Sequence, residues 1–471
     1  MAGFWKKLYR NSTQEVLQQI DEQIISQNGD DPGEINNQQK GLCVGQQSPK
    51  VVVIQNELIV VDPGSKDLLT EKRELKEKCK LKKKKEKDEE VNFQVVEGKE
   101  VSEEEPQLVP MAGYPLETYK LTSTDGYILT VFRLPNMNYS HSNGYSVFIQ
   151  HGILSNGANF VTLGNVSLVY LLWDAGYDVW IGNFRGTYYS QDHVNLTVYD
   201  KEYWDHSIDE MATIDMPLTM DFISKTTGKR GNIYYIGHSL GTTIALMYAA
   251  EYPEESAQHV RMFVFMAPAY TLSNMISPYK QIVPFVPLVW KIATDFDLYR
   301  LLGQSQPLRA IAQIFCLESP VLIQLCAQLH NLFYGPTTGV GSEKVPVYYN
   351  IVPGGTALKV LAQAADLVAN HFRKFDYGVK NFEKYGTLKP PPYDITKIKA
   401  PCYIMYGMND WVAGKKDAIN LYNTLSPEAR YGIREINDGD FNHLDFVYGR
   451  HAKQFVYDRI INLFDTFPNK T

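Results

Sequence analysis

Short apolar runs alternate with longer, helix-like segments from about residue 106 onward. The runs are YSVFIQ, YDVWIG, NIYYIG, MFVFMAP and CYIMYG. Near-continuous apolar runs linked by helices are typical of parallel strands that helices cover on both faces. Before them, residues 117–135 predict two strands joined around Asp125-Gly126, a dipeptide that favours a hairpin turn. We therefore expect an α/β fold with a mostly parallel central sheet.

The interval between MFVFMAP and CYIMYG is far longer than a crossover helix needs. It predicts an insertion over the sheet at residues 269–397, which divides a core into the parts 106–268 and 398–471. Within the insertion, residues 281–292 (QIVPFVPLVWKI) are densely apolar and contain two prolines. This segment suits a lid whose apolar face covers a site and meets lipid, or else ordinary core of the insertion.

Residues 1–105 lack this pattern. They are polar or charged except for one apolar island, VVVIQNELIVV, and they include the low-complexity run KLKKKKEK. We expect an extension that is disordered or a solvated helix and has little core of its own. A nuclear address or an acidic-lipid contact would use these lysines, but adjoining acidic residues nearly cancel their charge. The N-terminus shows no apolar core of a secretory signal.

Composition narrows the classes of function. With 44% hydrophobic residues in 471, the chain can bury a sizeable core. The net charge of -7 gives no general attraction to polyanions, so we do not expect nucleic-acid binding. No stretch holds about 20 uninterrupted apolar residues, so we expect no transmembrane segment.

A serine between two glycines follows the run NIYYIG. Gly237, His238, Ser239, Leu240 and Gly241 stand between a strand-like and a helix-like segment, the setting in which G-x-S-x-G predicts a nucleophile elbow. The glycines permit an abrupt turn, because larger side chains would collide with the adjoining backbone. The serine is then raised beside a helix N-terminus, whose positive end favours an oxyanion. The alternative is a plain strand-to-helix turn.

A serine hydroxyl needs a base and an orienting acid to become an effective nucleophile. In sheets of this kind the chain order is serine, acid, histidine. Asp410 follows CYIMYG and His443 follows YGIREIN, so both are expected in loops at the carboxyl ends of strands. We predict that Ser239, Asp410 and His443 form a catalytic triad. The alternatives are His451, in the expected final helix, and the acids Asp417, Asp438, Asp440 and Asp445.

An oxyanion hole requires two backbone donors. The N–H of Leu240, directly after the serine, is the first. The run VFIQHGIL supplies the second, because Gly152 after His151 permits a close approach and the N–H of Ile153 follows. Both donors are backbone groups, so the side chains at these two positions are free to vary.

The five cysteines are too few and too scattered for a four-ligand zinc site. Cys402 lies in CYIMYG and is expected to be a buried, inert thiol. Cys316 and Cys326 form a disulfide loop if the protein is secreted, or two unpaired thiols if it is not. Five Asn-x-Ser/Thr sequons suit a glycoprotein but also arise by chance in such a chain; they begin at Asn11, Asn138, Asn165, Asn195 and Asn469.

Eight collinear segments between about residues 113 and 465 resemble the acid lipase family, which includes gastric lipase, lysosomal acid lipase and insect relatives. They are GYPLETYKLTSTDGYIL, QHGIL, DAGYDVWIGNFRG, GHSLGTT, VPGGTALK, FDYGVKNFEKYGTLKPPPYDI, GMNDWVAG and FNHLDFVYG. The resemblance implies an α/β-hydrolase fold with a helical cap, and hydrolysis of ester bonds in neutral lipids at an oil–water or membrane interface. It implies the roles of nucleophile, acid and base for Ser239, Asp410 and His443, without a metal or cofactor.

The sequence departs from the family's pattern in places. Leu240 stands where the gastric and lysosomal enzymes usually have glutamine, and Tyr334 stands near the position of a free cysteine. The family's cap disulfide matches Cys316 and Cys326. Family members normally begin with a secretion signal, which suggests secreted or lysosomal proteins, whereas this chain begins with an unrelated extension.

These observations predict a lipase that transfers an acyl group through a serine ester. One alternative is an esterase or acyltransferase that acts on smaller soluble esters. Another is a catalytically silent lipid-binding protein, although such a protein has no need of serine, aspartate and histidine in the correct order.

Overall fold

The computed structural model describes residues 50–54, 57–61, 94–95, 113–136, 142–296, 300–301, 316 and 320–468. The chain divides into two compact units, Met1–Glu89 and Glu90–Thr471. In the first unit the apolar island forms an antiparallel hairpin of β1 (Lys50–Ile54) and β2 (Glu57–Val61), with Lys50 opposite Val61. The lysine run and the predicted boundary at residue 105 lie outside the described residues.

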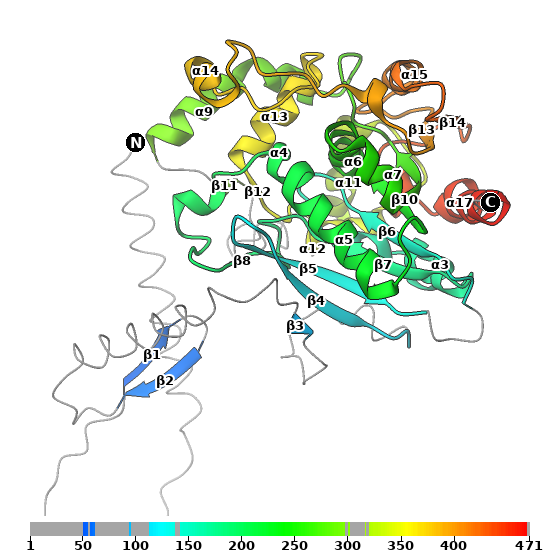
Figure 1. Ribbon diagram of the computed structural model, residues 1–471, viewed down its shortest axis with the longest axis horizontal. Helices are drawn as coiled ribbons and strands as arrows, with labels where there is room; N and C mark the ends of the chain where they lie inside the picture. Colours follow the sequence, from blue (N-terminus) through cyan, green and yellow to red (C-terminus); the bar gives the residue numbers. More distant parts are fainter. Residues whose placement is uncertain are drawn as a thin grey trace, which may run out of the picture. The chain divides into compact units, whose positions relative to one another are not determined.

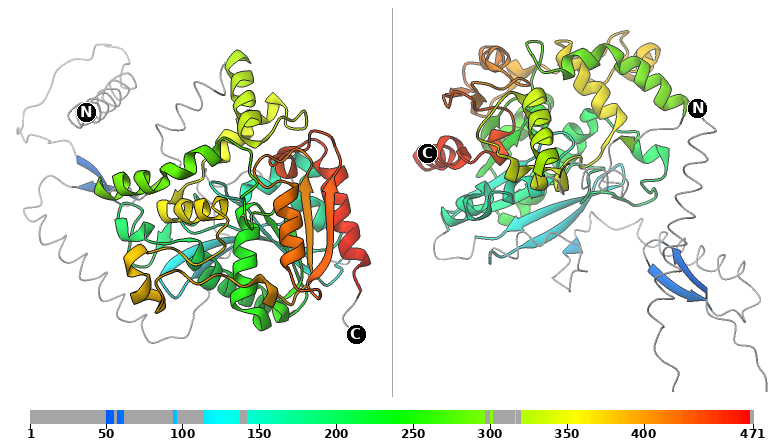
Figure 2. Two further views of the ribbon diagram at one scale, coloured as in Figure 1. Left: turned by 90° about the horizontal axis from the view of Figure 1, so that it is seen from above. Right: turned by 180° about the vertical axis from the view of Figure 1, so that it is seen from behind.

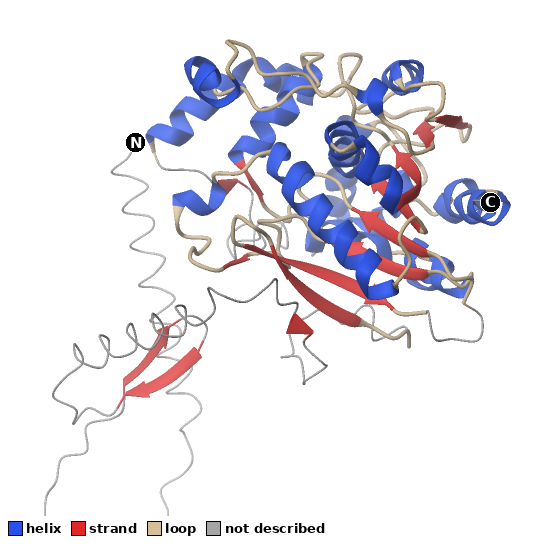
Figure 3. Ribbon diagram, viewed as in Figure 1, coloured by secondary structure: helices blue, strands red, loops and turns tan. Residues whose placement is uncertain are grey.

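A mixed sheet organises the second unit (Figures 1 and 3). Its described strands follow the order β14-β13-β10-β9-β6-β7-β5-β4-β3, and β8 pairs with β5. The strands from β14 to β7 are parallel, whereas β5, β4, β3 and β8 pair antiparallel. In chain order they are β3 (Gln94–Val95), β4 (Glu117–Thr122), β5 (Tyr127–Leu134), β6 (Ser146–Gln150), β7 (Asp178–Gly182), β8 (Asp192–His193), β9 (Ile233–His238), β10 (Val260–Met266), β13 (Cys402–Gly407) and β14 (Arg430–Ile436).

The predicted apolar runs are the central strands. Every residue of β6, β7, β9, β10 and β13 is buried, as expected for parallel strands covered on both faces. The hairpin predicted around Asp125-Gly126 joins β4 to β5, with Thr122 opposite Ile128. Gly126 adopts φ +95°, which a side chain would disfavour. The α/β class and the mostly parallel sheet are therefore confirmed.

Helices cover both faces of the sheet (Figure 2). The crossover through α3 runs from β6 to β7, toward one edge of the sheet, whereas the crossover through α5 runs back from β7 past β6 to β9. Because such crossovers are right-handed, α3 lies on one face of the sheet and α5 and α6 lie on the other. Phe464 of α17 stacks on Tyr234 of β9, which adds α17 to the sheet's cover. These helices are α3 (Leu168–Asp174), α4 (Ile208–Glu210), α5 (Met216–Thr227), α6 (Leu240–Glu251), α7 (Pro253–His259), α15 (Lys415–Thr424), α16 (Asp445–Tyr448) and α17 (Asp458–Thr466).

The long interval between β10 and β13 forms a mainly helical region, which we call the cap. Its helix α9 packs beside α13, and Trp290 of α9 contacts the ring of Phe375. The outer limits of 269 and 397 stay predictions. The described elements of the cap are α8 (Tyr279–Ile282), α9 (Val286–Asp295), β11 (Arg300–Leu301), α11 (Pro320–Tyr334), α12 (Val345–Ile351), β12 (Thr356–Ala357), α13 (Leu358–Val368) and α14 (Asn381–Tyr385).

Candidate active site

Ser239 occupies the turn between β9 and α6. Its backbone has φ 54° and ψ -118°, a conformation that L residues rarely adopt and that commonly marks a functional turn. The Ser239 N–H donates to the carbonyl of Met266 at the end of β10 (3.1 Å), and its own carbonyl accepts from the hydroxyl of Thr242 (2.6 Å). These bonds hold the strained turn in place.

Close packing requires two glycines of the elbow and brings a third close to the serine. A Cβ on Gly237 would lie 2.8 Å from the backbone carbon of Gly241, and one on Gly241 would lie 2.6 Å from the carbonyl oxygen of Gln150. Both distances are too short for real side chains. A Cβ on Gly152 would lie 3.1 Å from Cβ of Ser239, so the HGIL loop runs directly beside the serine.

Asp410 and His443 form a buried pair. The Nδ1 of His443 lies 2.9 Å from Oδ2 of Asp410, and only 4% and 6% of these two residues is exposed. The other carboxylate oxygen, Oδ1, accepts the N–H groups of Val412 and Ala413, each at 2.8 Å. These bonds fix the carboxylate with one oxygen toward the imidazole, which suits an acid that orients the base.

The alternative residues bond elsewhere. Exposed His451 contacts Asp438 at 2.8 Å rather than Asp410. Each of the other acids accepts from neighbours outside the pair. Asp417 accepts from Asn274, Asp440 from Thr338, and Asp445 from the N–H of Asn442.

His238, which sequence reasoning assigned only to the elbow, contacts the base directly. Its Nε2 lies 3.0 Å from the carbonyl oxygen of His443, and the two rings lie 5.0 Å apart. Burial lowers the pKa of His238 to about 3, so the ring is neutral and Nε2–H donates to that carbonyl. The residue before Ser239 therefore ties the backbone of His443 to the elbow.

His151 is a second buried histidine whose role the sequence did not reveal. Its Nε2 accepts the N–H of Phe184 (3.2 Å), so its proton is on Nδ1, which donates to the carbonyl of Gly152 (2.8 Å). Burial lowers the pKa of His151 to about 4, which preserves this neutral tautomer. The Gly152 carbonyl and the Ile153 N–H belong to the same planar peptide, so His151 sets the direction of the predicted oxyanion donor.

The other predicted donor, the N–H of Leu240, begins α6, where backbone N–H groups lack partners within the helix. Its apolar side chain is 4% exposed and joins the core. The substitution of leucine for glutamine thus keeps the backbone donor.

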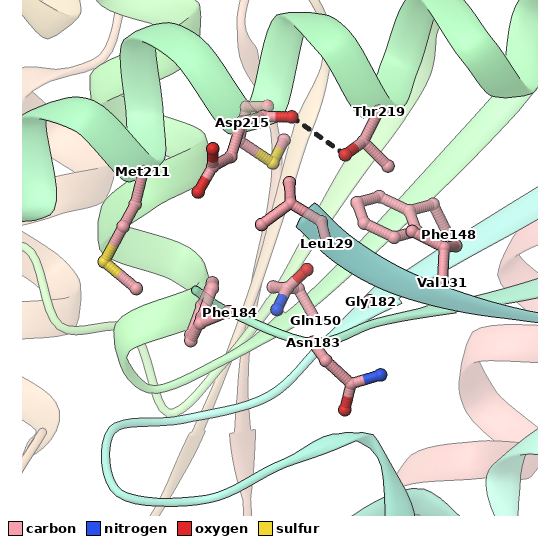
Figure 4. A pocket seen from close by; sticks show the side chains of 11 residues that line it. Leu129, Val131, Phe148, Gln150, Gly182, Asn183, Phe184, Met211, Asp215 and Thr219 are labelled. Carbon is pink, nitrogen blue, oxygen red and sulfur yellow. Dashed lines mark hydrogen bonds between the residues drawn. The ribbon is translucent and has the colours of Figure 1, made fainter. Parts of the chain in front are cut away.

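A small cavity lies between the strands β5, β6 and β7 and the helical residues 211–219 (Figure 4). Its volume is about 20 Å³, which is room for one water molecule. The buried Nε2 of Gln150 has no hydrogen-bond partner among the described residues. This cavity is too small for an acyl chain.

The cap contacts this site, since Tyr334 of α11 stacks on the ring of His443. Ser239 is only 7% exposed, so little of it is open to solvent. The predicted lid segment forms α8, a short 3-10 turn and α9. Several of its large apolar side chains face solvent, with Phe285 59% and Leu288 56% exposed, whereas Trp290 contacts Phe375. Ordinary core would cover these side chains, and the lid stays a prediction.

Cys316 and Cys326 are joined in a disulfide, with Cα atoms 5.7 Å apart. Burial raises the pKa of the Cys402 thiol, which fits the expected inert residue. The sequon residues Asn165 and Asn195 are exposed. The other three, Asn11, Asn138 and Asn469, lie outside the described residues.

Two features are absent from the part of the chain that the structure describes. None of their helices is long and apolar enough to cross a bilayer. In the same part of the chain, no group of three or more histidine, cysteine or acidic side chains is placed to hold a metal ion.

The sequence of this chain is similar to those of known α/β-hydrolases and lipases. Residues 145–449 match the family described as alpha/beta hydrolase fold, and residues 106–164 match the partial alpha/beta-hydrolase lipase region. Human lipase member K is 33% identical, with 77% of this chain and 90% of the relative covered. Human lysosomal acid lipase/cholesteryl ester hydrolase is also 33% identical (76% and 89% covered), and lipase lipl-1 of Caenorhabditis elegans is 31% identical (76% and 90%).

Proposed function

The chain belongs to the acid lipase family of α/β-hydrolases, and we propose that Ser239, Asp410 and His443 are the catalytic triad with which it hydrolyses neutral lipid esters. The protein is a serine ester hydrolase. The observation that carries the proposal is the buried Asp410–His443 pair, tied through His238 to the strained turn of Ser239. A serine, a base and an oriented acid are together what acyl transfer requires.

In the proposed reaction, Nε2 of His443 takes the proton of Ser239 as Oγ attacks the ester carbonyl carbon. The tetrahedral intermediate then collapses, the carbon–oxygen bond of the ester breaks, and the imidazolium gives its proton to the leaving alcohol. Water, deprotonated by His443, then attacks the carbonyl carbon of the serine ester. The bond from that carbon to Oγ breaks, the imidazolium returns its proton to Ser239, and the fatty acid is released. Asp410 keeps the imidazole in the correct tautomer and stabilises its charged form.

The N–H groups of Leu240 and Ile153 are proposed to hold the oxyanion of both intermediates. The first begins α6, whose positive end adds to the attraction. His151 holds the peptide of the second through its bond to the Gly152 carbonyl. One such donor is typically worth about a hundredfold to a thousandfold in rate.

Two features of the cap favour a lipid substrate over a small soluble one. Exposed apolar side chains on α9 offer a surface for an oil–water interface, while the buried serine requires that the cap move before substrate enters. Each methylene of a fatty acyl chain buried in the opened site would contribute roughly 0.8 kcal/mol. One relative is named a cholesteryl ester hydrolase, so sterol esters and triacylglycerols are both proposed substrates.

The proposal predicts that Ser239→Ala lowers hydrolysis of long-chain triacylglycerol or cholesteryl ester emulsions by about a thousandfold or more. Activity would be measured as fatty acid release by the purified full chain. Ser256→Ala, which removes a different buried serine, is the matched control and should stay near wild type.

A fluorophosphonate probe gives an independent test, because it labels only an activated serine. The wild type should react and Ser239→Ala should not. If Ser239→Ala kept wild-type activity, the triad would be wrong. Reaction with dissolved esters alone, without any preference for emulsions, would identify an esterase or acyltransferase instead.

A further inference from the structure

The C-terminal end of α11, in the cap, touches both loops of the proposed acid and base. Three consecutive backbone carbonyls accept hydrogen bonds there. That of Tyr334 accepts from the N–H of Trp411 (3.2 Å), that of Gly335 from the side-chain amide of Asn442 (2.6 Å), and that of Pro336 from the side-chain amide of Asn409 (2.5 Å). Asn409 and Trp411 flank Asp410, and Asn442 precedes His443.

Gly335 makes this close approach possible. Its φ is +105°, which disfavours any other residue. A Cβ there would collide with the carbonyl oxygen of Asn409 and would lie 2.9 Å from the ring of Trp411. The chain is thus packed against the Asp410 loop with no room for a side chain.

The side chain of Tyr334 faces the base. Its ring lies nearly parallel to the imidazole of His443, with an interplanar angle of 9° and centroids 6.0 Å apart. An aromatic ring offset over one face limits the directions in which the imidazole can turn. The triad bond to Asp410 fixes only one edge of the imidazole, so a neighbour over the face completes its positioning.

The hydroxyl of Tyr334 connects the base to α8, the helix in which the lid segment begins. The hydroxyl of Tyr279, in α8, donates to it (3.4 Å), and it shares a hydrogen bond with the hydroxyl of Tyr348, in α12 (3.1 Å). Burial raises the pKa of Tyr334 and of Tyr348 well above the ordinary value, so these phenols stay neutral donors. One side chain therefore contacts the lid, the cap and the base.

We propose that residues 334–336 position Asp410 and His443 from the cap, and that the Tyr279–Tyr334 hydrogen bond couples the lid to the base. Tyr334 is a positioning residue, since it acts through His443. The inference rests on the proposed function. It predicts that opening the lid, which separates α8 from α11, also changes the setting of the imidazole.

The first experiment measures kcat and KM of the full chain for dissolved p-nitrophenyl butyrate. Tyr334→Leu removes the ring from the face of His443 and should lower kcat about tenfold or more while KM stays within about twofold, because substrate is not bound by this residue. Tyr334→Phe restores the ring and should recover most of kcat. Tyr385→Leu, at another partly buried cap tyrosine, is the matched control.

The outcomes separate the two proposals. A wild type that fails to react with the fluorophosphonate probe would refute the triad itself. If the wild type reacts but Tyr334→Leu keeps its kcat, the positioning role is wrong and the triad stands. If Tyr334→Leu loses no more kcat than Tyr385→Leu at equal loss of melting temperature, the effect is general packing and the proposal is overturned.

The second experiment tests the coupling to the lid. Tyr279→Phe and Tyr334→Phe each break the same hydrogen bond of the covered state, so each should raise the rate on dissolved ester relative to emulsion by about twofold to fivefold. Tyr334→Phe also removes the bond to Tyr348, but the bond to Tyr279 is common to both variants, so the double variant should exceed Tyr334→Phe alone by little. Multiplicative effects, or no change in either single variant, would refute the coupling.

Discussion

Helices α6 and α9 are both rich in apolar residues but lie in opposite environments. Every residue of α6 from Leu240 to Ala250 is buried, whereas α9 turns large apolar side chains to solvent, with Leu288 56% and Ile292 46% exposed. Exposed apolar surface forgoes about 25 cal/mol for each Å² that could be buried. The core therefore buries the apolar residues that follow Ser239, while the cap keeps several of its own exposed.

The pH dependence of the free energy of unfolding distinguishes a buried group of the core from one at the contact between core and cap. Burial and the nearby Arg185 lower the pKa of His206, in the core, to about 3. Burial raises the pKa of Asp445, which lies against Gly339 of the cap, to about 6. On acidification His206 gains its proton first in the unfolded chain, whereas Asp445 gains its proton first in the native chain. The two groups therefore give the free energy of unfolding opposite dependences on pH.

The sign follows from proton linkage. Between pH 6.5 and about 3 the unfolded chain protonates His206 and the native one does not, so its contribution to stability is present above pH 6.5 and falls as pH falls, by up to ~1.4 kcal/mol per pH unit. Between about pH 6 and 3.8 the native chain holds a proton on Asp445 that the unfolded chain lacks, so this contribution rises as pH falls.

Urea denaturation at pH 7 and pH 5 measures both slopes. We expect His206→Gln to lose stability less steeply than wild type on acidification, and Asp445→Asn to lose it more steeply. Slopes rather than absolute values are compared, because each substitution also changes packing. Parallel slopes for all three proteins would show that neither group is perturbed as described.

The next prediction concerns His151, which holds the peptide of the Ile153 donor. His151→Leu removes the bond to the Gly152 carbonyl, so the donor loses its fixed direction, and kcat for a dissolved ester should fall about tenfold to a hundredfold. His151→Asn can place an amide near the position of Nδ1 and should retain more activity. The test is kcat on p-nitrophenyl butyrate with melting temperatures measured in parallel.

An equal kcat for His151→Leu and wild type would show that the peptide is oriented without the histidine. Dissolved ester is the right substrate because its hydrolysis does not depend on the lipid contact proposed for the cap.

The same contrast explains what the sequence could and could not predict. The strands, the elbow and the order of Ser239, Asp410 and His443 follow from local patterns, since apolar runs mark buried strands and the acid and base follow two of them. The roles of His151 and His238 could not be predicted, because their partners are backbone groups of Phe184 and His443 that only folding brings near.

The organisation of the cap was harder to predict from the sequence. The high density of apolar residues in 281–292 could not distinguish a lid from ordinary core, because the exposure of these side chains depends on what packs against α9. The contacts of Gly335 were also hidden, since the glycine is explained only by the loop of Asp410 beside it. The pairing of β1 with β2 was missed because an apolar island of that length also suits other structures.

The smallest predicted effect tests whether the exposed side chains of the lid segment, residues 281–292, meet lipid. The double substitution Phe285→Ser and Leu288→Ser removes two large apolar side chains without touching the triad, so hydrolysis of a long-chain triacylglycerol emulsion should fall about fivefold while the rate on dissolved ester changes less than about twofold. Tyr199→Ser, at a 92% exposed residue outside the cap, is the control and should change neither rate. A loss of equal size on both substrates would mean that α9 supports the closed core rather than the lipid contact, and the two helices would then serve the same purpose.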